Sequence, residues 1–203
     1  SMVSGNMVSN NGNGIRISSG GNSNIFGNDV SNNNVSGVSL FNSDNGTITE
    51  NILVNNTIGI DLAFSNNSII LNNGVREGGR GINLADSGYN IVSNNTALNN
   101  RYGMYVLRSQ WNMLLNNTAG TSVNHGVVLV NSSDNEFINN ILTSNGDHGV
   151  YLTNSSSNTF GNNIASSNGR GIYLISSSGN NILNNTILDN REYAVLLSYC
   201  TGN

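Results

Sequence analysis

Short apolar stretches recur along the whole chain at an almost constant distance. Each stretch holds two to four residues, and glycine, asparagine and serine separate it from the next. The clearest stretch begins with glycine and returns every 22 or 23 residues, at Gly14, Gly37, Gly59, Gly81, Gly103, Gly126, Gly149 and Gly171, with Ala194 in the last copy. The sequence therefore contains eight complete repeats with a partial repeat at each end.

Positions within a repeat are counted here from its glycine, which is position 0. Positions 1 and 3 are apolar in all nine copies, and positions 11 and 16 are apolar in every complete repeat. In the repeat that starts at Gly81, this pattern predicts short strands around residues 82–84, 92 and 97. Because side chains alternate along a strand, positions 1 and 3 should point inward and position 2 outward.

Strands this short bury their apolar side chains only when successive repeats stack. We therefore predict an all-β fold in which residues 1–203 form one domain, a right-handed, single-stranded parallel β-helix (solenoid) with 22–23 residues per coil. A leucine-rich repeat would need L-x-x-L-x-L, and a left-handed β-helix a six-residue rhythm; neither is present. The chain begins and stops in the middle of a coil. We expect either a fragment of a longer solenoid or a module whose uncapped terminal coils self-associate end to end.

Position 14 is asparagine in every complete repeat. A side-chain amide both donates and accepts hydrogen bonds, so stacked copies can bond to one another and satisfy the backbone of a buried turn. We predict one structural asparagine ladder, formed by Asn28, Asn51, Asn73, Asn95, Asn117, Asn140, Asn163 and Asn185. Serine occupies position 6 in seven of nine copies and is expected to cap turn backbone. The glycine at position 0 and the many asparagines near corners can tolerate left-handed backbone.

Composition narrows the class of protein. The chain has 45 Asn, 28 Ser and 24 Gly among 203 residues, which by itself suggests disorder. However, 55 Val, Ile, Leu and Phe residues and a net charge of only −4 favour a folded core. The lack of proline fits strands whose N–H groups are all needed. With seven arginines and no lysine, the sequence offers no basic surface for nucleic acid, and it has no apolar run that could insert into a membrane.

The motif G-I-x-L-x-x-S-x-x-N-x-I-x-x-N-N is clear at residues 81–95, 149–163 and 171–185. It resembles the right-handed parallel β-helix repeats of the NosD-like and carbohydrate-binding and sugar-hydrolase (pectate-lyase-like) superfamily. The resemblance covers essentially the whole chain and implies the fold. It does not select one function, because the superfamily includes polysaccharide lyases, hydrolases and epimerases as well as archaeal-type surface proteins without known activity.

The outward positions hold the candidate binding residues. Tyrosine rings stack on sugar rings, and arginine pairs with uronate carboxylates. Two outward columns, the position before each glycine and position 2, supply a candidate glycan-contact stripe of Tyr105, Tyr151, Tyr173, Arg170, His148, His125, Arg80 and Tyr102. The simpler alternative is that tyrosine is a good residue for an exposed strand and that the charged groups are merely solvated. A groove among Tyr151, Tyr173, Arg170 and His148 would favour glycan binding.

Metal binding and catalysis have weaker support. His125 and His148 lie at equivalent positions one coil apart, and with Asp147 they are the candidate metal ligands, because imidazole suits copper or zinc. Two histidines are too few for a firm site, so we expect no metal and no other cofactor. The eleven acidic residues are scattered, whereas polysaccharide-cleaving relatives gather several acids on neighbouring coils. We therefore expect no catalytic residue in this chain.

Together these patterns favour a non-catalytic structural or binding module of an extracellular or cell-surface protein, with a polysaccharide or glycan as its partner. Two alternatives remain open. One is a polysaccharide lyase, hydrolase or epimerase of the pectate-lyase-like class, or the β-helix part of such an enzyme. The other, implied by the resemblance, is a copper-binding NosD-like protein of the periplasm. Neither nucleic-acid binding nor membrane insertion is expected.

Overall fold

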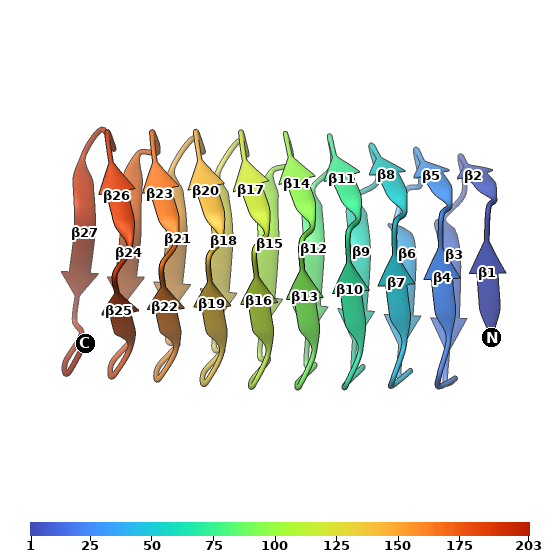
Figure 1. The fold of residues 1–203 in the computed structure, drawn as a ribbon, viewed down its shortest axis with the longest axis horizontal. Helices are drawn as coiled ribbons and strands as arrows, with labels where there is room; N and C mark the ends of the chain where they lie inside the picture. Colours follow the sequence, from blue (N-terminus) through green and yellow to red (C-terminus); the bar gives the residue numbers. More distant parts are fainter.

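The structure, a computed structural model, describes residues 1–203 as 27 strands without a helix. The strands form three parallel sheets of nine strands each, and each coil places consecutive strands in different sheets (Figure 1). Sheet A contains β1 (Met2–Ser4), β4 (Asn24–Phe26), β7 (Thr47–Thr49), β10 (Ile69–Leu71), β13 (Ile91–Ser93), β16 (Met113–Leu115), β19 (Glu136–Ile138), β22 (Thr159–Gly161) and β25 (Asn181–Leu183). Sheet B contains β2 (Met7–Ser9), β5 (Asp29–Ser31), β8 (Ile52–Val54), β11 (Gly74–Arg76), β14 (Thr96–Leu98), β17 (Thr118–Gly120), β20 (Ile141–Thr143), β23 (Ile164–Ser166) and β26 (Thr186–Leu188). Sheet C contains β3 (Asn13–Ser18), β6 (Ser36–Phe41), β9 (Ile58–Ala63), β12 (Arg80–Ala85), β15 (Tyr102–Leu107), β18 (His125–Val130), β21 (His148–Thr153), β24 (Arg170–Ile175) and β27 (Tyr193–Ser198).

Equivalent residues of successive coils pair directly with one another. Ile82, for example, is the register partner of Ile60 on one side and of Met104 on the other. The chain therefore winds into a rod of stacked coils, with its two termini at opposite ends (Figure 1). This confirms the all-β, right-handed parallel β-helix that the repeat predicts. No helix in the structure has the length and apolar character needed to cross a bilayer. The fragment character of the chain and its end-to-end association stay predictions.

The core is a continuous column of aliphatic side chains enclosed by the three sheets. Positions 1 and 3 of sheet C point inward, as Ile82 and Leu84 do, and so does the central residue of each strand in sheets A and B, such as Val92. Inside the core, the rings of Phe137 and Phe160 stack on successive coils with centroids 4.8 Å apart. Burying one such large apolar side chain stabilises a protein by about 1.5–3 kcal/mol, and here most of that burial is between coils.

The position-14 asparagines form a ladder at the corner between sheets A and B. Asn51 donates both its backbone N–H and its Nδ2–H to Oδ1 of Asn73 on the next coil, at 3.0 Å each. Its Nδ2 group also donates to the carbonyl oxygens of Ile25 and Thr49, at 3.0 Å each. The same pattern continues from coil to coil, so the side chains satisfy backbone groups that are buried in a turn. Asn6 extends the ladder at its N-terminal end.

Two further asparagine columns close the other corners, and the sequence pattern did not predict them. Position 19 supplies one between sheets B and C, with Asn11, Asn33, Asn56, Asn100, Asn145, Asn168 and Asn190. Position 9 supplies one between sheets C and A, with Asn90, Asn112, Asn135, Asn158, Asn180 and Asn203. These columns were missed because some repeats carry other residues there, such as Gly46 at position 9 and Gly78 at position 19.

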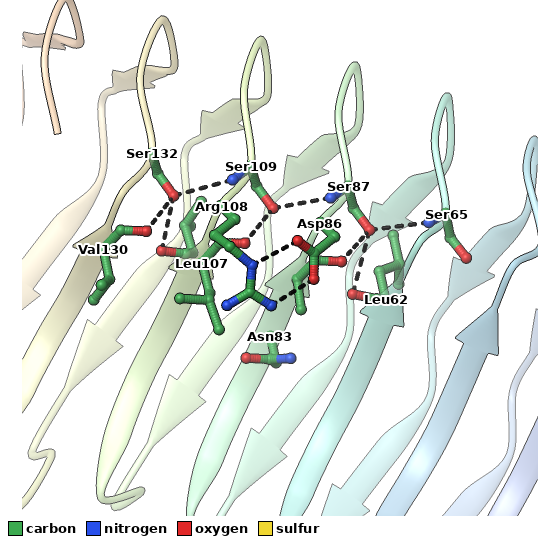
Figure 2. A network of polar contacts seen from close by, with 12 residues as sticks. Leu62, Ser65, Asn83, Asp86, Ser87, Leu107, Arg108, Ser109, Val130 and Ser132 are labelled. Carbon is green, nitrogen blue, oxygen red and sulfur yellow. Dashed lines mark hydrogen bonds and ion pairs between the residues drawn. The ribbon is translucent and has the colours of Figure 1, made fainter. Parts of the chain in front are cut away.

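The serines at position 6 form a column of hydrogen-bonded turn caps (Figure 2). They lie at the same corner as the position-9 asparagines, between sheets C and A. Ser87 donates its N–H to Oγ of Ser109 at 3.0 Å, and its own Oγ–H to the carbonyl oxygen of Ala85 at 2.8 Å. In the last coil Cys200 takes this place and accepts the N–H of Ser177 at 3.4 Å through Sγ. The serines thus act as turn caps rather than as nucleophiles.

The glycine at position 0 is required because a Cβ would not fit there, and its backbone is not left-handed. Positive φ among the glycines occurs only at Gly5, Gly27, Gly179 and Gly202, none of which is at position 0. A Cβ on Gly81 would instead lie 2.4 Å from the carbonyl oxygen of Gly103 on the next coil, closer than any real contact. Many asparagines that precede a ladder residue do adopt left-handed backbone, as Asn94 does with φ of 54°, whereas the ladder asparagines such as Asn95 do not.

Candidate functional site

Aromatic, imidazole and guanidinium groups gather on the outer face of sheet C. The residues before each glycine are register partners along the rod, as Arg80 is of Tyr102 and His148 is of Arg170. Position 2 forms a parallel column in which Tyr151 pairs with Tyr173. The structure therefore brings the predicted stripe together on one face, where its members are half-buried: Arg80, Tyr102, Tyr105, His125, His148, Tyr151, Arg170 and Tyr173.

The rings of this face contact one another without a break. His125 is central: its ring centroid lies 4.7 Å from that of His148, 5.1 Å from that of Tyr151 and 5.7 Å from that of Tyr102. Tyr151 in turn lies 5.6 Å from Tyr173. We call the six rings of Tyr102, Tyr105, His125, His148, Tyr151 and Tyr173 the aromatic stripe.

Not every residue of position 2 reaches solvent, although the alternation pattern predicts that all of them point outward. Ser39, Asn83 and Val128 have exposed fractions of only 0%, 3% and 2%. Their larger neighbours lie over them; Arg80, for example, donates from Nη1 to Oδ1 of Asn83 at 3.1 Å. The outer face of sheet C is therefore a packed layer of side chains rather than a set of separate groups in water.

Two guanidinium groups lie beside the N-terminal end of the aromatic stripe. The guanidinium carbon of Arg80 is 4.0 Å from the ring centroid of Tyr105, and that of Arg101 is 5.5 Å from the ring centroid of Tyr102. Neither arginine forms an ion pair with a carboxylate. They border a surface hollow of about 370 Å³, here called the arginine cleft, which is lined by Thr57, Ile58, Gly79, Arg80, Arg101 and Tyr102.

The C-terminal end of the stripe differs, because its arginine is neutralised. Arg170 Nη2 lies 2.6 Å from Oε2 of Glu192, and the guanidinium also lies 5.1 Å from the ring of Tyr173. Tyr151, Tyr173, Arg170 and His148 do meet on this face, but they line none of the hollows of the surface. The groove sought among these four residues is absent, and the hollow of this face lies instead at Arg80 and Arg101.

Sequence reasoning missed Arg101 and did not single out Asp61. Arg101 directly precedes Tyr102, outside the two columns that were followed, so only its charge could have drawn attention to it. Asp61 accepts a hydrogen bond from Nδ2 of Asn83 at 2.7 Å. Burial raises the pKa of the Asp61 carboxyl, while the hydrogen bond from Asn83 and the charges of Arg16 and Arg80 act in the opposite direction.

The two histidines are neutral at pH 7. Burial, together with the charge of His148, lowers the pKa of His125 to about 4, and Asp147 opposes this shift. Burial and the charge of Arg170 likewise lower the pKa of His148. Oδ2 of Asp147 lies 3.8 Å from Nδ1 of His125, too far for a hydrogen bond.

The arrangement of His125, His148 and Asp147 does not fit a copper or zinc site. The imidazole planes are only 8° from parallel, so their in-plane lone pairs run side by side instead of converging on one ion. Both Nδ1 atoms are also covered by protein atoms. No cluster of three or more His, Cys, Asp or Glu side chains is arranged to hold a metal ion.

The chain is similar to one protein family in sequence and to several solved structures in fold. A family model described as "Periplasmic copper-binding protein (NosD)" matches residues 1–62 and 55–203. No curated protein matches the sequence. Among solved structures, the A-module of the mannuronan C-5 epimerase AlgE6 from Azotobacter vinelandii superposes with a TM-score of 0.73 and 20% identity, over 87% of this chain and 54% of that one.

Two other solved structures share the fold. A double mutant of the periplasmic alginate epimerase AlgG has a TM-score of 0.71 and 19% identity, over 88% of this chain and 50% of that one. The enzymatically active domain of tailspike protein 2 from bacteriophage CBA120 has a TM-score of 0.64 and 10% identity, over 86% of this chain and 35% of that one. At these identities the likeness is one of fold, and the chain spans about half the length of the epimerase structures.

Proposed function

The chain belongs to the NosD family, and we propose that it is a carbohydrate-binding β-helix module that holds an acidic polysaccharide along the outer face of sheet C. The observation that carries this proposal is the arginine cleft at the end of the aromatic stripe. Neither Arg80 nor Arg101 forms an ion pair, and both border a hollow that opens beside Tyr102. A uronate carboxylate there would form an ion pair with these guanidinium groups.

The aromatic stripe gives the polymer a track along the rod. Successive coils of a parallel β-helix are about 4.8 Å apart, so the rings from Tyr102 to Tyr173 follow one another at short, regular intervals. Half-buried rings contribute apolar surface at little cost in side-chain entropy, because their mutual contacts already hold them in place. A linear sugar polymer that lies parallel to the rod axis would contact several of them in turn.

The solved structures of the same fold support a polyuronate as the class of ligand. Two of them are epimerases whose names specify mannuronan and alginate, which are acidic polysaccharides. In this chain a positive cleft lies on the face where the aromatic side chains gather, so charge and ring stacking act on the same ligand. The family description and the name of AlgG both refer to the periplasm. We accordingly place the protein outside the cytoplasm.

Binding without turnover is the form of this function that we favour. Glu192, an acid beside the stripe, is held by Arg170 at 2.6 Å, and Asp147 lies at its exposed edge. His125 is a poor general base, because its pKa is lowered to about 4. A copper function receives no support from the geometry of His125 and His148.

One observation favours a second candidate, a polysaccharide-modifying enzyme. Asp61 lies on the same face, and burial raises the pKa of its carboxyl, as is common for a general acid. Incubating the protein with polymannuronate and polygalacturonate and analysing the products by NMR separates the two candidates. Binding without any new product supports the binding module. Turnover that is lost in Asp61→Asn supports the enzyme.

The binding proposal is tested by calorimetry with oligomers of mannuronate and galacturonate, and with dextran as the neutral control. We expect saturable binding of an acidic oligomer that falls at least about tenfold in the Arg80→Ala, Arg101→Ala double variant. Arg76→Ala is the matched control, because Arg76 lies in sheet B and pairs with Glu77. Dextran binding that falls equally in the double variant, or an equal loss in Arg76→Ala, would contradict the proposal, and so would no binding of any acidic oligomer.

A further inference from the structure

Tyr89 and Trp111 form an exposed aromatic pair at the corner between sheets C and A. They occupy position 8 of successive coils, and their rings stack with centroids 5.0 Å apart and planes 16° from parallel. The exposed fractions are 58% for Tyr89 and 50% for Trp111. This pair lies on a different face from the aromatic stripe, because the corner of Ser87 and Ser109 separates it from sheet C.

The fold does not need aromatic side chains at this position. Both residues have left-handed backbone, with φ of 58° at Tyr89 and 55° at Trp111. The other coils fill the same left-handed position with small or polar residues: Asn22, Asn45, Asn67, Asp134, Ser157, Gly179 and Gly202. A bulky residue in this conformation costs on the order of 1 kcal/mol, whereas asparagine and glycine accept it readily. Two adjacent coils therefore carry a disfavoured residue type that packing does not require.

Polar groups surround the pair and leave it accessible from two sides. On the side of the preceding coils lies a hollow of about 170 Å³, bordered by both rings, by Gln110 and by Asp86 and Arg108. The last two form a double hydrogen bond, with Nε to Oδ1 at 2.7 Å and Nη2 to Oδ2 at 2.6 Å, so they offer polar edges without net charge (Figure 2).

The second hollow, of about 250 Å³, adjoins Trp111 on the side of the following coil. Asn112, Met113, Asp134 and Glu136 line it with the indole. Tyr89 covers one face of the indole, so the other face is the one directed to this hollow. An indole face next to carboxylate and amide groups suits a ligand with an apolar C–H face and several hydroxyl groups, since the hydroxyls can donate to Asp134 and Glu136.

We propose that the Tyr89–Trp111 pair is a second carbohydrate-binding site, which holds one uncharged sugar ring against the free face of Trp111. The carboxylates of Asp134 and Glu136 exclude a uronate, because neither forms an ion pair that would neutralise it. The site therefore differs in ligand chemistry from the arginine cleft. It does not depend on the function proposed for sheet C.

Trp111 is the only tryptophan of the chain, so its fluorescence reports on this site alone. The probes are neutral oligosaccharides of glucose, mannose, galactose and N-acetylglucosamine, each titrated to about 10 mM, which detects dissociation constants in the millimolar range. We expect a saturable blue shift with at least one of them and none with oligogalacturonate. Arg80→Ala, Arg101→Ala should leave the blue shift unchanged, which separates this site from the cleft.

Two variants complete the test, and calorimetry follows binding in both because Trp111→Asn removes the fluorophore. Trp111→Asn and Tyr89→Asn place at position 8 the residue that other coils carry there, so both should fold and be at least as stable as the parent chain. Trp111→Asn should abolish binding, and Tyr89→Asn should weaken it by at least about tenfold. Absence of binding by every neutral probe overturns the proposal. Concentration-dependent dimerisation that Trp111→Asn removes would identify a protein contact instead and would also overturn it.

Discussion

The imidazole rings of His125 and His148 stack face to face on adjacent coils, with centroids 4.7 Å apart and planes 8° from parallel. The in-register pairing of the β-helix forces this proximity, because both residues precede the glycine of their coil. Two imidazolium ions at this distance would repel each other, so protonation of one ring opposes protonation of the other. Burial of the ring, followed by this repulsion, lowers the pKa of His125 to about 4.

Acidification should therefore destabilise the protein before its carboxylates titrate. The pKa of His125 falls from 6.5 to about 4 on folding, so between these values the unfolded chain binds a proton that the folded chain does not. The free energy of unfolding should decrease as pH falls from about 6.5 to 4, by on the order of 2 kcal/mol, and be flat above that window.

Chemical denaturation at a series of pH values measures this dependence. A His125→Gln, His148→Gln double variant is the control, since it lacks both titrating rings and should lose much less stability between pH 6.5 and 5. Equal slopes in the variant and the parent chain would show that other groups cause the acid sensitivity.

Asn95→Ala should cost at least about 3 kcal/mol of stability. The Asn95 side chain accepts from the backbone N–H and Nδ2 of Asn73, at 2.9 and 3.0 Å, and donates to the carbonyl oxygen of Ile70 at 2.9 Å. Its removal leaves several buried groups without partners. The matched control is Asn94→Gly at the neighbouring exposed position, where φ is 54° and glycine fits without strain. Thermal denaturation of both variants is the measurement, and similar melting temperatures would contradict the structural role of the ladder.

Alanine substitutions at two glycines in consecutive strands should have different effects on the free energy of unfolding. A Cβ on Gly81 meets the carbonyl oxygen of Gly103 at 2.4 Å, whereas a Cβ on Gly74 meets nothing within 4 Å, and neither glycine has positive φ. Gly81→Ala should therefore destabilise the chain by at least about 2 kcal/mol, because backbone of the next coil must move. Gly74→Ala should be neutral or stabilising by up to about 1 kcal/mol. Urea denaturation midpoints of the two variants test the difference, and a reversed order would refute this account of position 0.

The fold could be predicted almost completely from the sequence, because every coil repeats the same physical requirements. Apolar residues at positions 1, 3, 11 and 16 fix which side chains face the core, and the constant asparagine at position 14 marks a corner. The reason for the glycine at position 0 could not be read in the same way. It depends on how closely the backbone at Gly81 approaches that of Gly103, which is a distance between coils and not a property of one repeat.

The candidate sites could be predicted less completely from the sequence, since they depart from the repeat. The alternation of inward and outward positions placed Tyr105 and Tyr151 on one face. It also predicted that Val128 is exposed, whereas its exposed fraction is only 2%. Arg101 was not predicted because it lies one residue before the column that precedes each glycine. A cleft depends on the lengths and rotamers of side chains from several coils, and periodicity carries no information about them.

The proposed polyuronate binding should depend strongly on salt concentration and only weakly on pH. Its charge comes from the guanidinium groups of Arg80 and Arg101, while His125 and His148 are neutral at pH 7 because burial lowers the pKa of each. Affinity for oligogalacturonate should therefore change by less than about twofold between pH 8 and 6.5, yet fall about tenfold between about 50 and 500 mM salt. Calorimetry under these conditions measures both effects. A steep gain in affinity on lowering the pH from 8 to 6.5 would mean that the histidines carry the charge, and salt-independent binding would exclude the guanidinium groups as the anchor.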